Sequence, residues 1–203
     1  WSSDVCSSDL YRRLLEDLAE APELARYDLG RAARRGPEAT GGLNVEGLCE
    51  GPGGGLLIGF RNPVPGGKAL LVPLLNPAEV VQGRRSRLGE AVELALGGYG
   101  IRDIVWTGEG YWILAGSFSG SGKIKLYWWA GGSALPELME GVSLKGLKPE
   151  ALAWAPERSG ARLLVTSDDG KRKLDGQRAK DVADRSRWSF RSLWVEAGPG
   201  QLP

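Results

Sequence analysis

The feature that most limits the fold is a change of hydrophobic period at Leu43. From this residue onwards, short apolar runs rich in β-branched, aromatic and leucine side chains alternate with clusters of Gly, Pro, Ser and Asn. Runs bounded by turn residues in this way are typical of β-strands. Glycine accounts for 31 of the 203 residues, about twice its usual share of roughly 7%, which suits many tight turns. The sequence therefore predicts an antiparallel all-β fold.

The predicted strands share this composition and lie at Val45–Glu50, Leu56–Arg61, Lys68–Leu74, Ala91–Leu96, Ile101–Thr107, Tyr111–Ser117, Ile124–Ala130, Ala151–Ala155, Arg162–Ser167 and Ser189–Glu196. A weak outer strand is expected within 136–144, and a polar segment, 170–187, interrupts the last unit.

A repeat groups these strands into units. The charged position of the first strand in each unit recurs at Glu46, Arg102 and Glu150, at intervals of 56 and 48 residues. Such intervals are near the roughly 40–50 residues of a four-stranded propeller blade. We expect residues 39–203 to form an incomplete β-propeller of about three blades. Further blades would lie upstream, since propellers usually have at least about four.

The chain ahead of the strands follows a different, helical pattern. Leu14, Leu15 and Leu18 recur at the spacing of one helix face. A proline at the start of 22–35 suits the first turn of a second short helix. We therefore predict a short helical segment over residues 11–38.

The first ten residues, WSSDVCSSDL, match the translation of a common sequencing-library adapter. We expect residues 1–10 to be an adapter artefact rather than native protein, so Trp1 and Cys6 carry no structural meaning. A native start and any signal peptide would then be missing from this sequence.

Composition excludes several kinds of chemistry. The chain contains no His, which removes imidazole as a base or as a metal ligand. Cys49 is the one cysteine outside the first ten residues, and we expect it to be a buried apolar side chain.

A net charge of +1 does not indicate binding of nucleic acid or of an acidic membrane surface. No apolar run approaches the ~18 residues of a membrane span, so we expect a soluble chain of undefined compartment and partners.

Several ordered motifs resemble a bacterial family designated domain of unknown function (DUF) 3616. They are LNVEGL, LLIGFRNPVPGGKALLVPL, LGGYGIRDI, WILAGS, LYWW, KPEALAW and LLVTSDDG, and the resemblance covers roughly residues 11–195. It implies a propeller-like domain with no assigned activity. More distantly, the chain is similar to phytase-like and esterase-like propellers, which carry similar Glu-Gly-Leu strand starts and bind calcium. Arg102 departs from that pattern, because it stands where a fully acidic central site would have Glu.

The repeated positions form the first candidate site. Corresponding residues of the innermost strands gather around the axis of a propeller, which would bring Glu46, Arg102 and Glu150 together. One interpretation is a structural ion-pair network around the planar guanidinium. The other is a ligand or calcium site with Asp103 and Asn44 as additional oxygen donors, since calcium takes about six to eight oxygens.

The ends of the second strands form the second candidate site. Arg61, Asn62, Ser117, Asp168 and Asp169 occupy equivalent places in their units, which predicts that they cluster on one rim. Loop residues on a rigid scaffold often carry function. The alternative is ordinary turn chemistry, which Asn-Pro and Asp-Gly pairs favour.

Two other segments carry weaker signals. The lysines and arginines within 171–187 are interspersed with Asp, which favours a solvated insert over a phosphate or nucleic-acid site. The run GSFSGSGK at 116–123 lacks the first glycine of a phosphate-binding loop and is followed by a strand pattern, so we interpret it as a hairpin turn.

The sequence supports two functional hypotheses and identifies no catalytic residue set. The first is a ligand-binding or scaffolding domain with no catalysis by this stretch and no evident cofactor. The alternative is a calcium-dependent, phytase-like or esterase-like hydrolase of a phosphate or other ester. In that alternative, carboxylates hold the metal and Arg61 or Arg102 holds the phosphate.

Overall fold

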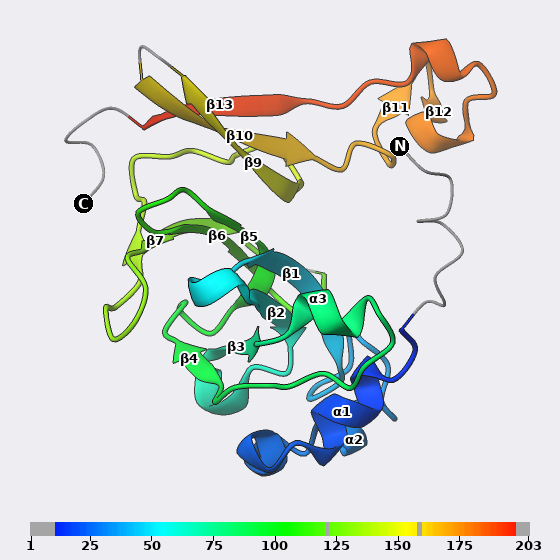
Figure 1. Cartoon of the computed structure of the whole chain (residues 1–203). Coiled ribbons are helices and arrows are strands. Elements are labelled where there is room, and N and C mark those ends of the chain that lie inside the picture. Colours follow the sequence, from blue (N-terminus) through cyan, green and yellow to red (C-terminus); the bar gives the residue numbers. More distant parts are fainter. Residues whose placement is uncertain (1–10, 121, 158–159, 198–203) are drawn as a thin grey trace.

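A computed structural model describes residues 11–120, 122–157 and 160–197 (Figure 1). Antiparallel sheets are the predominant regular structure of these residues, which confirms the predicted all-β architecture. The described strands do not close into a ring, so the number of blades stays a prediction. The expected adapter artefact at 1–10 lies outside the described residues.

Three of the four antiparallel sheets among the described residues follow one another along the chain and form the stack. The first sheet has the order β1 (Asn44–Glu50), β2 (Leu56–Asn62), β3 (Ala69–Leu74) and β4 (Val92–Leu94). The second sheet has the order β5 (Gly100–Trp106), β6 (Tyr111–Gly116), β7 (Lys125–Trp129) and β8 (Glu137–Leu138). The third sheet has the order β9 (Pro149–Glu157), β10 (Gly160–Ser167) and β13 (Ser192–Ala197).

The predicted strands correspond to these elements, with shorter outer strands than expected. The weak strand expected within 136–144 is reduced to Glu137–Leu138. The polar segment is an insert between β10 and β13, and we call residues 170–191 the insert. It contains β11 (Lys173–Leu174), β12 (Gln177–Arg178) and the 3-10 helices η5 (Ala179–Asp181) and η6 (Arg185–Arg187).

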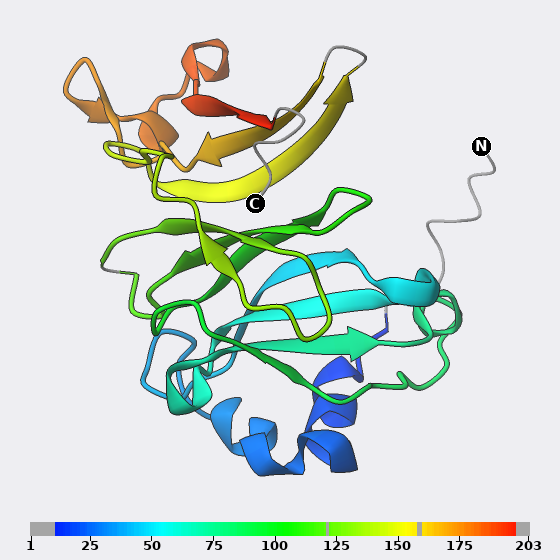
Figure 2. The ribbon, with the colours of Figure 1, turned by 90° about the vertical axis from the view of Figure 1, so that its left-hand side faces the viewer.

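The sheets stack face to face, as Figure 2 shows. β6 lies in the middle of the stack, and all of its residues are buried. Its Tyr111 and Ile113 pack towards the first sheet, whereas Trp112 and Leu114 pack towards Leu163 and its neighbours in the third sheet. Because successive strand side chains point to opposite faces, one apolar strand fills two cores.

The N-terminal segment covers the outer face of the first sheet. It consists of α1 (Leu14–Glu20), the 3-10 helix η2 (Pro22–Tyr27) and α2 (Leu29–Ala32). Apolar side chains of this segment, among them Leu18 and Leu24, pack against Phe60 of β2. The remaining short helices are η3 (Pro52–Gly54), η4 (Pro65–Gly67) and α3 (Pro77–Val80).

The prediction of one continuous helix over 22–35 is wrong. Asp28 takes a left-handed conformation with φ 46° and ψ 49°, which interrupts the helix. Its carboxylate accepts a hydrogen bond from the backbone N–H of Arg31, so the same residue caps the start of α2.

None of the helices in the described residues has the length and apolar character needed to cross a bilayer.

Candidate functional site

One end of the sheet stack carries most of the residues that the sequence singled out. In each sheet, the start of the first strand pairs with the end of the second strand, because the strands are antiparallel. The pairs at this end are Asn44 with Asn62, Gly100 with Gly116, and Pro149 with Ser167. The repeated charged positions and the rim residues therefore lie at the same end of the stack.

The repeated charged residues are the extra residues of three β-bulges. The register passes from Val45 to Gly47 around Glu46, and Arg102 and Glu150 are bypassed in the same way in their own sheets. A bulge leaves one residue unpaired and changes the direction of its side chain, and bulges are frequent beside functional sites. The sequence repeat therefore marks a repeated structural device.

The structure arranges these charges as two ion pairs. Arg61 Nη1 lies 2.7 Å from Glu46 Oε1, and Arg61 Nε donates a hydrogen bond of 3.0 Å to the carbonyl of Ser117. Arg102 pairs instead with Glu150. The expected trio is thus divided, because Arg61 from the rim set takes one of its carboxylates. Each guanidinium links two neighbouring sheets.

A cavity of about 670 Å³ opens beside the two ion pairs. Its volume lies within the range of about 300–1,000 Å³ that is usual for small-molecule sites. Seven cationic side chains line it: Arg61, Arg102, Lys123, Lys125, Lys145, Lys148 and Lys171. Three carboxylates also line it: Glu38, Glu150 and Asp168. We call this the basic cavity, and its excess of positive charge favours anions.

The two arginines are nearly enclosed by protein. The side chains of Arg61 and Arg102 are each 7% exposed, which is unusual for charged groups. Two polar atoms of these ion pairs are buried and have no hydrogen-bond partner among the described residues. They are Nε of Arg102 and Oε2 of Glu46, the carboxylate that pairs with Arg61. A buried polar group without a partner costs about 1–3 kcal/mol of folding free energy. Because this arrangement lowers the stability of the protein, we look for a role in ligand binding that explains it.

The other predicted site residues hold the structure around the cavity. Asp103 accepts hydrogen bonds from the backbone N–H groups of Ile104 and Leu152, at 2.9 Å and 2.6 Å, and so joins the second and third sheets. Burial raises the pKa of Asp103 above its ordinary value, although these hydrogen bonds oppose the shift. Asn62 donates to the carbonyls of Pro37 and Ala39. These contacts are structural, and neither residue lines the basic cavity.

Asp169 closes the base of the insert. Arg191 donates from Nε and Nη2 to the two carboxylate oxygens of Asp169, at 2.8 Å and 2.7 Å. This bidentate pair lowers the pKa of Asp169 below its ordinary value, and burial opposes the shift only in part. Asp169 therefore stabilises the fold when it is ionised.

Replacing Asp169 with Asn should lower the free energy of unfolding at pH 7 by about 2 kcal/mol, because hydrogen bonds to a charged group are lost. Since the pKa of Asp169 is depressed in the folded state, its stabilisation is present above the unfolded pKa of about 4 and is lost as the pH falls below it. Urea unfolding from pH 7 to pH 3 should show the difference between wild type and D169N shrinking with acid. Asp175→Asn, which removes an exposed ion pair of the same insert, should have little effect at any pH. An undiminished difference at pH 3 would contradict this role.

The carboxylates expected to hold calcium are bound by other groups of the protein. Glu46 and Glu150 are paired with arginines, and Asp103 is occupied by backbone N–H groups. The amide of Asn44 donates to Glu46. Within the described parts of the chain, no three Cys, Asp or Glu side chains are placed to hold a metal ion. Calcium binding stays a prediction, which thermal melts with calcium and with a chelator test.

Sequence reasoning did not single out Glu38, Lys125, Lys145 or Lys148 of the basic cavity. It considered the segments that contain Lys123 and Lys171 as phosphate sites, and favoured a hairpin turn and a solvated insert instead. Lys123 belongs to the glycine-rich run at 116–123, where a strand follows as expected, and Lys171 belongs to the insert. Lys145 and Lys148 precede β9. The five lysines come from three separate segments of the chain, and no regular spacing in the sequence unites them. The one signal available was the density of lysine in loops that adjoin the rim.

Fold and site together define an all-β protein of stacked antiparallel meanders with a basic cavity at one end of the stack. The chain belongs to the family described as Protein of unknown function (DUF3616), whose family model matches residues 4–168. This confirms the family resemblance of the sequence. No curated protein and no solved structure matches the chain.

Proposed function

We propose that this chain is a ligand-binding, propeller-like domain whose basic cavity takes a small anion such as a phosphorylated molecule. The observation that carries the proposal is the pair of nearly enclosed guanidinium groups, Arg61 and Arg102, in a cavity of net positive charge. Arginine presents a planar fork of donors that matches phosphate and carboxylate oxygens.

The guanidinium groups are held ready for a ligand by the protein. Arg61 is fixed by Glu46 on one side and by the Ser117 carbonyl on the other. Arg102 is fixed by Glu150. Little side-chain freedom is then lost when an anion binds, which is the advantage of preorganisation. The lysines around the entrance raise the local concentration of anions by electrostatic attraction.

The arrangement of the sheets supports the propeller-like part of the proposal. Each sheet is an antiparallel meander, and the first strand of one sheet lies against the first strand of the next, as β1 does with β5 and β5 with β9. This is the order that blades have around a central axis. The cavity then lies where the innermost strands of neighbouring blades begin.

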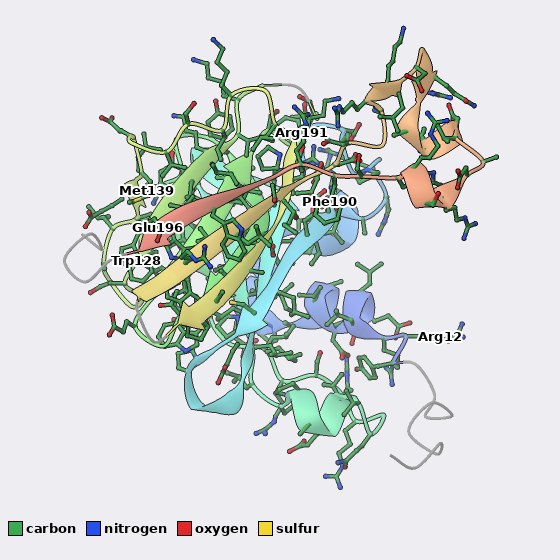
Figure 3. All side chains as sticks on the ribbon, turned by 90° about the horizontal axis from the view of Figure 1, so that it is seen from above. Arg12, Trp128, Met139, Phe190, Arg191 and Glu196 are labelled. Atoms are coloured by element: carbon green, nitrogen blue, oxygen red, sulfur yellow. The ribbon has the colours of Figure 1, made fainter. Side chains whose placement is uncertain are left out.

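Thermal melts and calorimetric titration with inorganic phosphate test the proposed site. A ligand at about a hundred times its Kd adds about 2.7 kcal/mol to stability, so phosphate should raise the melting temperature. Arg61→Gln and Arg102→Gln should each weaken phosphate binding by at least about tenfold, since charge-assisted hydrogen bonds are among the strongest. Arg12→Gln is the matched control, because Arg12 lies outside the basic cavity (Figure 3).

A double lysine variant and melts with calcium complete the test of the anion site. Lys145→Gln combined with Lys148→Gln changes exposed side chains of the cavity, so the variant should fold normally and still lose affinity for phosphate. The same melts run with calcium and with a chelator test the hydrolase alternative. Calcium stabilisation in the absence of any effect of phosphate would overturn the anion site, as would unchanged phosphate binding in folded R61Q and R102Q.

A further inference from the structure

A second hollow adjoins the basic cavity. It has a volume of about 570 Å³ and lies between the end of β10 and the insert. Its lining includes Trp188, Phe190 and Lys180, and Asp168 lines both this hollow and the basic cavity. Asp168 is therefore the one lining residue that the two spaces share.

The aromatic side chains of this hollow are exposed although the insert holds them in place. Trp188 is 48% exposed and Phe190 is 66% exposed, and Phe190 precedes the clamped Arg191 (Figure 3). Trp188 Nε1 donates a hydrogen bond of 2.9 Å to the carbonyl of Val182, and the guanidinium of Arg185 lies 5.5 Å from the Trp188 ring centroid. Large aromatic rings held open to solvent beside a polar cavity suit contact with a ring of a ligand.

Asp168 stands between the lysines and arginines of the basic cavity and the aromatic side chains of the second hollow. Its Oδ1 accepts the backbone N–H of Gly170 at 2.9 Å, which orients the carboxylate. The other oxygen accepts no hydrogen bond from the residues that the structure describes. An anionic group would avoid this carboxylate, whereas sugar hydroxyls are donors that a carboxylate binds well.

We propose that the ligand is a nucleotide, with its phosphate in the basic cavity, its ribose hydroxyls at Asp168 and its base on Trp188 and Phe190. The order of chemical groups along the site, cationic, then carboxylate, then aromatic, matches the order of groups along a nucleotide. Aromatic side chains stack on any base, so this surface selects for a base without reading its identity. The proposal rests on the proposed anion site and adds the substrate class.

Isothermal titration of the whole chain with three probes tests this inference. Adenosine 5′-monophosphate and ribose 5-phosphate share the phosphate and the sugar and differ in the base, and adenosine lacks the phosphate. Adenosine 5′-monophosphate should bind at least about fivefold tighter than ribose 5-phosphate, the lower end of the effect of stacking one base on an aromatic side chain. Adenosine should bind more weakly than the nucleotide, because it makes no contact with the arginines.

Variants then assign the gain to the aromatic surface. Phe190→Ala should weaken the binding of adenosine 5′-monophosphate almost to the level of ribose 5-phosphate. The affinity for ribose 5-phosphate itself should stay unchanged. Trp194→Ala is the matched control, because Trp194 is also an exposed aromatic residue near the insert in sequence but lines neither space. Asp168→Asn should weaken all three probes, since each contains ribose, without weakening the binding of inorganic phosphate.

The possible results separate this inference from the anion site. Binding of phosphate and ribose 5-phosphate with no gain from the base overturns the nucleotide and leaves the anion site standing. An equal loss for both probes in F190A also overturns the nucleotide, because a general distortion then explains the loss. If inorganic phosphate fails to bind as well, both proposals are wrong.

Discussion

Replacing Gly100 with alanine is expected to destabilise the protein by about 3 kcal/mol, at the upper end of the cost of forcing extra atoms into a packed site. Gly100 begins β5, and a Cβ atom there would overlap the carbonyl oxygen, carbonyl carbon and Cα of Arg61. All three atoms belong to the backbone of β2, so no side-chain rotation relieves the overlap. The first and second sheets must separate at the end that carries the basic cavity.

Urea unfolding followed by tryptophan fluorescence measures this effect. Gly141→Ala is the matched control, since a Cβ atom at Gly141 would meet nothing within 4 Å, and the change should stay within about 0.5 kcal/mol. The G100A variant should also bind phosphate more weakly, because its clash displaces Arg61. Equal unfolding curves for G100A and G141A would show that the two sheets do not approach as closely as described.

Replacing Trp112 with alanine is expected to lower the free energy of unfolding by about 3–5 kcal/mol, the usual cost of truncating a buried aromatic side chain. Trp112 is 1% exposed and packs between the second and third sheets. Its ring centroid lies 5.2 Å from that of Trp128 in an edge-to-face arrangement. The variant loses this contact and leaves a cavity in the core.

Trp112→Phe and Trp194→Ala refine this prediction. Nε1 of Trp112 is buried without a hydrogen-bond partner among the described residues, so W112F loses no hydrogen bond. It also keeps an aromatic ring in the core and should therefore cost clearly less than W112A. Trp194 is 44% exposed, and its truncation should cost about 1 kcal/mol or less. Equal losses for W112A and W194A in denaturant unfolding would contradict the assignment of Trp112 to the core.

The strands could be predicted because their signal is local. Apolar runs of a few residues between turn formers indicated the strands of all three sheets, including β6 with both faces buried. The break at Asp28 could not be predicted, because its left-handed backbone conformation depends on how η2 and α2 pack against the first sheet. The outer strands β4 and β8 were overestimated for a related reason, since edge strands gain hydrogen bonds on only one side.

The candidate site was predicted in its positions and only partly in its connections. The repeat located Glu46, Arg102 and Glu150, because an equivalent place in each unit needs an equivalent spacing along the chain. It could not show that Glu46 pairs with Arg61, because that choice depends on bulges and on the approach of the Ser117 carbonyl from the neighbouring sheet. Ion pairing is decided by distances of a few ångströms between strands that are far apart in sequence.

By itself, the amino-acid sequence determined the antiparallel sheets, their repeat, the family and the lack of histidine in these 203 residues, since these follow from composition and short-range pattern. Tertiary structure alone decided that five lysines from three segments of the chain line one cavity with two enclosed arginines, and that Trp188 and Phe190 of the insert line a second hollow that shares Asp168 with it. The physical reason is that a binding cavity is a property of the space between elements. Residues from remote segments share that space only after the sheets have stacked and the Asp169–Arg191 pair has closed the base of the insert.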